Sequence, residues 1–179
     1  MLLYENLNIP NKKAFISRVK AISTVLNINP NWLMFIMNFE SGGTFSSSIR
    51  NPYSGGVGLI QFMPNTALGL GTTCDALARM TNVEQLDFVY SYYAPYKGRI
   101  KNGEDMYLIT FFPIALGQSD SYVFQSANLS AWIIAKQNPS LNLDGDGKIT
   151  MKEWKRALRE HLESRVESKY IDEFYKKKK

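Results

Sequence analysis

Apolar residues recur every three or four positions near the start of the chain, which is the spacing that places them on one face of a helix. Phe15, Val19, Ile22 and Leu26 follow this spacing, and Asn11 precedes them as a candidate helix cap. We therefore expect a first helix over about 11–26, with one buried face.

A second helix is predicted to run to Glu40. Asn29 and Pro30 form a typical helix start, with Asn as the cap and Pro at the first helical position. Glycines follow at positions 42 and 43, as is usual just past a helix end. Glu40 lies seven residues after Leu33 on the same apolar face, so the pattern places a carboxyl group on a stripe that should be sheltered from water.

Similar patterns farther along predict a mainly α chain. The segment 42–58 is rich in Gly, Ser and Asn and is expected to form a loop. Thr81 and Glu84 match a capping box, so a helix should begin near Asn82. The expected later helices cover about 64–70, 82–95, 104–113, 128–137 and 154–166.

Glu40 is the main candidate for chemistry. Partial burial and the negative end of the helix dipole both favour the protonated form of a carboxyl group at this position. A carboxylic acid that keeps its proton near neutral pH is suited to general acid catalysis. The alternative is that Glu40 is an ordinary charged residue of the last helical turn and points to water.

Two motifs support the catalytic interpretation. Residues 40–42 are Glu-Ser-Gly, and residues 58–64, about twenty positions later, are Gly-Leu-Ile-Gln-Phe-Met-Pro. In their order and spacing these motifs resemble the soluble lytic transglycosylase family, whose members are related to goose-type lysozyme. The resemblance covers about residues 12–120. It implies a lysozyme-like fold, with Glu40 as the acid/base that cleaves the β-1,4 bond between N-acetylmuramic acid and N-acetylglucosamine in peptidoglycan.

The resemblance also suggests substrate-binding residues. It assigns Ser41 and Gln61 to the glycan cleft, although the Gln61 amide could instead bond to nearby backbone. Tyr53 could stack on a sugar or simply pack within its loop. Phe112 falls where the family has a tyrosine that orients the catalytic acid, and Pro113 replaces the following asparagine. This third motif therefore departs from the bacterial enzymes of the family and resembles a phage subgroup with an aromatic-Pro pattern. Packing of Phe112 in the core is the competing interpretation.

The absence of acidic residues between Glu40 and Asp75 favours one particular mechanism. Ordinary glycosidases use two carboxyl groups, whereas a lytic transglycosylase uses one and lets the substrate's own 6-hydroxyl attack. A hydrolytic lysozyme stays possible if a later acid folds into the cleft. The candidates for that second acid are Asp75, Asp87, Asp105 and Asp120. A third alternative is a non-catalytic, glycan-binding component of a phage tail or baseplate.

A different kind of motif, unrelated to those around Glu40 and Gln61, lies near the C-terminus. Residues 142–153 fit the twelve-residue EF-hand-type calcium loop, with oxygen ligands at alternate positions, Gly at position 6 and Glu at position 12. The expected ligands are Asn142, Asp144, Asp146, the backbone carbonyl of Lys148, and Glu153. Asn at the first position removes one negative charge and should weaken binding. The alternative is an Asx-rich turn that binds no ion. If calcium does bind, a single loop without a paired EF-hand predicts a structural role for the ion, far from the catalytic residue.

Length, composition and charge bear on the number of domains and on binding to nucleic acid or membrane. The 179 residues fit one domain, with a catalytic body over about 11–137 and a calcium-loop appendage over about 138–175. The net charge of +5 arises after position 147, where eleven Lys and Arg face six Asp and Glu, so a solvated basic tail is expected rather than nucleic-acid binding. No apolar run is long enough for a membrane span, and Cys74 has no partner for a disulfide. No secretory signal is recognised, so a phage particle or phage lysis proteins would have to deliver the enzyme to the wall.

Overall fold

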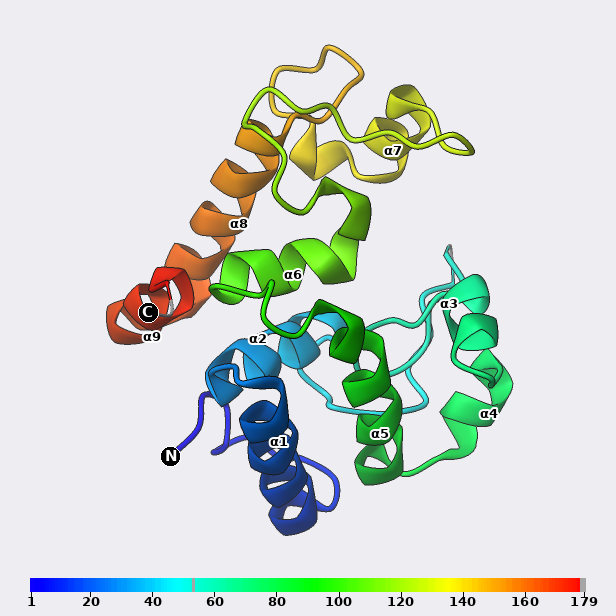
Figure 1. Cartoon of the computed structure of the whole chain (residues 1–179), viewed down its shortest axis with the longest axis vertical. Helices are drawn as coiled ribbons and strands as arrows, with labels where there is room; N and C mark the ends of the chain where they lie inside the picture. Colours follow the sequence, from blue (N-terminus) through cyan, green and yellow to red (C-terminus); the bar gives the residue numbers. More distant parts are fainter. Residues whose placement is uncertain (53, 178–179) are drawn as a thin grey trace. The chain divides into compact units, whose positions relative to one another are not determined.

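The computed structural model describes residues 1–52 and 54–177. Within these residues the chain is mainly helical and contains no regular strand, as predicted for an α protein (Figure 1). The described chain forms two compact units, residues 1–103 with Lys177 and residues 104–176. Sequence reasoning expected one domain whose appendage begins near 138, whereas this division falls between Gly103 and Glu104. No described helix has both the length and the apolarity needed to span a membrane.

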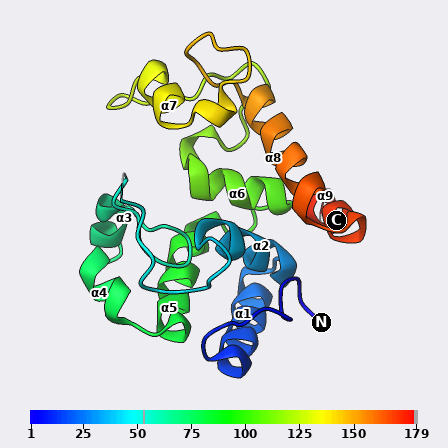
Figure 2. The ribbon, with the colours of Figure 1, turned by 180° about the vertical axis from the view of Figure 1, so that it is seen from behind.

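Among its described residues, the first unit contains five α-helices and one 3-10 helix. Their bounds are α1 Lys12–Leu26, α2 Pro30–Glu40, α3 Pro64–Gly69, α4 Cys74–Arg79, α5 Asn82–Tyr93 and η1 Ala94–Tyr96. Helix α1 packs against both α2 and α5, and the views from front and back show these three helices together (Figures 1 and 2). The predicted stripe of α1 is buried, since Phe15, Val19, Ile22 and Leu26 are all at most 2% exposed.

The caps explain where the helices of this unit begin. Asn29 caps α2 by accepting a hydrogen bond from the Asn31 backbone N–H at 2.9 Å, as predicted. Both bonds of the predicted capping box between Thr81 and Glu84 are present at the start of α5. Asn11 occupies the cap position of α1 but makes no side-chain cap bond, because its backbone is left-handed with φ at 52°.

The second unit contains the remaining helices. Their bounds are α6 Gly103–Phe111, η2 Pro113–Ala115, α7 Ala131–Gln137, η3 Pro139–Leu141, α8 Met151–Arg165 and α9 Ser168–Tyr175. The first residue of α6, Gly103, belongs to the first unit. Trp154 of α8 is 1% exposed and stacks on Tyr107, with ring centroids 5.7 Å apart. The apolar residues predicted to form one face of the helix over 154–166 are Trp154, Leu158, Leu162 and Val166. The first three are buried in α8, and Val166 is buried at its C-cap.

The helices differ from the predicted ones in several places: α7 begins at Ala131 rather than near 128, α8 begins at Met151 rather than near 154, and α9 was not predicted. Helix α6 ends at Phe111, short of the expected end at 113, because Pro113 lacks an amide donor and instead begins η2. Helix α4 was not predicted from the sequence. It is an α-helix of six residues that begins at Cys74 and is capped by the Thr73 side chain, so it is too short to display a helical period.

Candidate functional site

Glu40 is the last residue of α2 and is half-buried. The helix stops there because the backbone turns left-handed at Gly42 and Gly43, with φ of 59° and 80°. The residues before it on α2, from Trp32 to Met37, are buried in the core of the first unit. The carboxyl group is therefore carried by a rigid, well-packed helix at the point where the chain leaves the core.

Ser41 belongs to the turn that follows Glu40. Its side chain is fully buried, and its Oγ accepts a hydrogen bond from the Phe45 backbone N–H at 2.9 Å. Its backbone carbonyl accepts a hydrogen bond from Thr44 Oγ1 at 2.7 Å. These contacts give Ser41 a role in shaping the turn after Glu40, and its predicted contact with substrate stays untested.

The second motif forms a short hairpin, which we call the site hairpin and define as residues 56–62. Val57 and Phe62 exchange two backbone hydrogen bonds of 3.1 and 2.8 Å, and Val57 also pairs with Arg50. The four residues between Val57 and Phe62 form a tight loop with left-handed backbone at Gly58 and Gln61, where φ is 77° and 53°. The Gly-rich motif is therefore a turn that depends on two unusual backbone conformations.

Gln61 lies at the end of this tight loop and is half-exposed. Its Nε2 donates a hydrogen bond to the Gly58 carbonyl at 3.0 Å, which is the backbone contact that sequence reasoning held as the alternative. This contact holds the amide in one orientation. Gly56 lies against it, since a Cβ at position 56 would be 3.1 Å from Gln61 Oε1.

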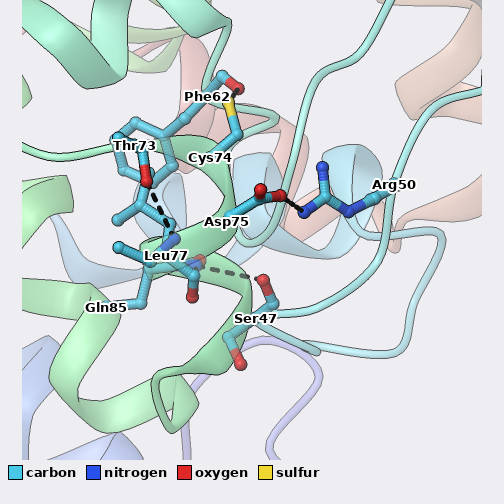
Figure 3. Close-up of polar contacts among 9 residues, drawn as sticks. Ser47, Arg50, Phe62, Thr73, Cys74, Asp75, Leu77 and Gln85 are labelled. Atoms are coloured by element: carbon cyan, nitrogen blue, oxygen red, sulfur yellow. Dashed lines mark hydrogen bonds and ion pairs between the residues drawn. The ribbon is translucent and has the colours of Figure 1, made fainter.

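Gln85 of α5 is a site-shaping residue that sequence reasoning missed. Its side chain is completely buried. Its Oε1 accepts from the Leu59 backbone N–H at 2.7 Å. Its Nε2 donates to the carbonyls of Ser47 and Leu77 at 3.1 and 3.0 Å, and Figure 3 draws Gln85 with these two partners. The available signal was an amide one position before the apolar Leu86, on a face that should be buried.

Tyr92, also on α5, was likewise missed. Its ring packs edge-on against Phe62 of the site hairpin, with centroids 6.4 Å apart. Burial raises the pKa of the Tyr92 hydroxyl, and the nearby Tyr96 and the carboxylate of Glu40 raise it further. Tyr92 is therefore a neutral hydroxyl within electrostatic range of Glu40, in the same unit.

Three of the four acidic residues considered as a second catalytic carboxyl group are ion-paired. The pairs are Asp75 with Arg50 at 2.5 Å, Asp87 with Arg18, and Asp120 with Lys155 at 2.7 Å. Figure 3 shows the first of these pairs, which joins the loop after α2 to α4. Each of these carboxylates already contacts a cation, so it would have to leave that ion pair before it could serve as the base in a glycan cleft.

Two further residues, Tyr53 and Phe112, were predicted to contact substrate. Tyr53 lies outside the described residues. Phe112 belongs to the second unit, where its ring packs edge-on against Phe124 at 5.4 Å and lies near Phe111 at 6.4 Å. These contacts favour the packing interpretation of Phe112, and its role toward substrate stays a prediction.

The predicted calcium loop follows η3 in the second unit. Asp144 accepts a hydrogen bond from the Asp146 N–H at 3.0 Å, and Asp146 accepts one from the Lys148 N–H at 2.8 Å. The Oδ1 of Asn142 is buried and has no hydrogen-bond partner. An unpartnered oxygen of this kind at the first ligand position fits a cation site, since calcium prefers oxygen ligands.

Glu153, the expected twelfth-position ligand, is already engaged. One of its oxygens accepts from the Leu143 N–H, and the other accepts from the Thr150 N–H and hydroxyl. Although burial raises the pKa of Glu153, these hydrogen bonds outweigh it and lower the pKa overall. In residues 1–52 and 54–177, no three His, Cys, Asp or Glu side chains gather closely enough to hold a metal ion. Glu153 would therefore have to exchange some of these hydrogen bonds for calcium.

Three comparisons with known proteins were made, with family models, curated proteins and solved structures, and none gives a match. The family resemblance therefore depends on the two sequence motifs around Glu40 and Gln61. What the structure adds is their common location in the first unit.

Proposed function

We propose that this chain is a peptidoglycan-degrading muramidase with a lysozyme-like fold, acting as a single-acid lytic transglycosylase. Glu40 is the acid/base, and Gln61 on the site hairpin contacts the glycan strand. The observation that carries the proposal is a half-buried carboxyl group at the end of a packed helix, in the same compact unit as the Gly-rich hairpin of the second motif.

The proposed reaction needs one carboxyl group. Glu40 donates its proton to the glycosidic oxygen as the bond between this oxygen and C1 of N-acetylmuramic acid breaks. The 6-hydroxyl of the same sugar forms a bond to C1 and returns its proton to Glu40, which leaves a 1,6-anhydro end. The ion pairs of Asp75 and Asp87 support a mechanism without a second acid from the first unit.

The test of Glu40 is its replacement by Gln, which keeps the shape of the side chain and removes the acidic proton. We expect Glu40→Gln to lower the rate of clearing of cell-wall fragments by about a hundredfold or more. Glu160→Gln, on an exposed position of α8, is the matched control and should clear at the wild-type rate. Equal clearing by wild type and Glu40→Gln would defeat the assignment of Glu40.

The products distinguish this proposal from its two rivals. Mass spectrometry of digested peptidoglycan should find 1,6-anhydro ends. Reducing ends would indicate a hydrolytic lysozyme, and intact glycan with wild-type protein would indicate a non-catalytic glycan-binding component of a phage tail or baseplate. Under this proposal the enzyme acts on the bacterial cell wall and is delivered by a phage particle or by phage lysis proteins.

We also propose that residues 142–153 bind one calcium ion with a structural role. The buried, unpartnered Oδ1 of Asn142 favours this over a loop that binds nothing. Asp144, Asp146, the Lys148 carbonyl and Glu153 would supply the other oxygens. When bound, the ion would hold the loop to the start of α8, where Glu153 lies in the first turn.

Titration calorimetry with calcium chloride, after treatment with a chelator, tests this second proposal. Trp132 offers an optical signal, because its ring is 60% exposed and lies 3.4 Å from the place a Cβ would take at Gly147 in the loop. We expect heat of binding and a change in tryptophan fluorescence that Trp132→Phe removes. Absence of heat and of any shift in melting temperature would refute calcium binding.

A further inference from the structure

The buried amide of Gln85 is placed to control the candidate site without touching a glycan. Gln85 lies on α5 and is completely buried, so no substrate can reach it. Its three hydrogen bonds go to three separate segments, namely the site hairpin, the loop after α2 and the end of α4. All three partners are backbone groups, so the side chain fixes the course of the chain itself.

The hydrogen bonds of Gln85 match its donors and acceptor. An amide side chain has one acceptor oxygen and two N–H donors. The oxygen is used by the Leu59 N–H, and the two donors are used by the carbonyls of Ser47 and Leu77, the two partners that Figure 3 draws. No other side chain of this size supplies both one acceptor and two donors, so any substitution leaves at least one buried backbone group without its partner.

The hydrogen bond between Gln85 and Leu59 lies next to the contacts of Gln61, the residue that we propose binds substrate. Leu59 follows Gly58, and the Gly58 carbonyl accepts bonds from both the backbone N–H and the side-chain Nε2 of Gln61, at 3.2 and 3.0 Å. Gly58 itself lies against the Gln85 amide, where any Cβ would overlap it. The orientation of Gln61 is therefore linked to Gln85 through two consecutive residues of the hairpin.

We infer that Gln85 is a positioning residue, which holds the tight loop of the site hairpin so that Gln61 is oriented for a glycan strand before the strand binds. The hairpin needs such support because it has few backbone bonds of its own and two left-handed residues. A loop ordered in advance avoids the entropic cost of ordering it on binding. The kinetic consequence rests on the proposed function, whereas the effect on the hairpin does not.

The experiment compares Gln85→Met, which keeps the length and loses all three bonds, with Gln118→Met, the same change at an exposed position of the second unit. On soluble, uncrosslinked glycan strands, we expect Gln85→Met to raise KM by about tenfold, the change that one buried hydrogen bond can produce. Partial unfolding would instead lower the maximal rate and leave KM unchanged. An unchanged KM for Gln85→Met would therefore overturn the inference.

Gln85→Glu provides a second variant in case the methionine variant does not fold. The introduced carboxylate can accept from the Leu59 N–H but repels the Ser47 and Leu77 carbonyls. Protonation at lower pH restores one donor. We expect its KM, relative to wild type at the same pH, to return toward the wild-type value on acidification. A ratio independent of pH would count against positioning by Gln85.

Hydrogen exchange separates failure of this inference from failure of the proposed function. In Gln85→Met, we expect the Leu59 amide to exchange about tenfold faster or more, while amides of α1 keep their wild-type rates. This result would support positioning even if the wild-type protein cleaves no peptidoglycan. Unchanged exchange at Leu59 would overturn the inference whatever the activity.

Discussion

The site hairpin of the first unit and the acidic loop of the second unit, by which we mean the predicted calcium loop 142–153, are both glycine-containing turns, but they are stabilised differently. In the hairpin, the Gln85 amide satisfies the backbone around Leu59 from within the core. In the acidic loop, Asp144 and Asp146 are exposed, their bonds are local, and the buried oxygen of Asn142 has no partner. The polar groups of the hairpin have hydrogen-bond partners within the protein, whereas the acidic loop has one buried oxygen, Asn142 Oδ1, without such a partner.

This difference indicates what each turn requires. A turn whose polar groups are paired inside the protein should depend on exact packing and be insensitive to ions. A turn with an unpartnered buried oxygen among carboxylates should depend on a cation. Substitutions in the two turns should therefore respond differently to packing and to calcium.

Gly58→Ala should have the largest effect on stability. A Cβ at position 58 would overlap the Gln85 amide, and the left-handed backbone adds strain, so we expect the first unit to lose about 3 kcal/mol. Gly98→Ala is the matched control, because φ there is also positive at 83° and no atom lies within 4 Å of the new Cβ. Denaturant unfolding should show a smaller loss for the control, and equal losses would contradict the packing argument.

Ser41→Ala should destabilise the turn after Glu40 by about 2 kcal/mol, because it leaves the buried Phe45 N–H without its acceptor. Ser91→Ala, at an exposed serine of α5, should change stability little. Chemical denaturation measures both variants. Full stability of Ser41→Ala would contradict this structural role of the Ser41 hydroxyl.

Asn142→Asp should strengthen calcium binding on the order of tenfold, because it restores a negative charge at the first ligand position. Asn128→Asp adds the same charge at an exposed position outside the loop and should leave affinity nearly unchanged. Titration calorimetry gives both affinities. Calcium should raise the protection of α8 amides from hydrogen exchange and leave the site hairpin unchanged, and the reverse pattern would break the comparison.

Acidification should weaken the start of α8 by less than about 1 kcal/mol, because Glu153 is partly exposed. Its folded pKa is lowered from the ordinary 4.5, so its contribution is full above that pH and is lost as pH falls through the lowered value. Glu153→Gln cannot titrate. In calcium-free buffer, the stability difference between wild type and Glu153→Gln should shrink below pH 4.5, and a constant difference would refute this assignment.

Much of the candidate site was predicted from local patterns. The end of α2 at Glu40, the cap at Asn29 and the box at Thr81 depend on residues that are neighbours in the chain, and all three are confirmed. Gln85 and Tyr92 were not predicted. The place of Gln85 beside Leu86 indicates a buried amide, but its partner Ser47 is 38 positions away and Phe62, which Tyr92 contacts, is also distant, so local patterns do not identify these contacts.

Helical period, caps and glycine stops act within a few residues, so local patterns were enough to predict the mainly α class and the position of Glu40 at a helix end. The support of the site hairpin by α5 and the pairing of Asp75 and Asp87 with arginines are evident only in the folded chain. Burial and ion pairing depend on which distant segments meet. Which segments meet depends on the packing of the whole unit, and no repeat of apolar residues along the chain indicates it.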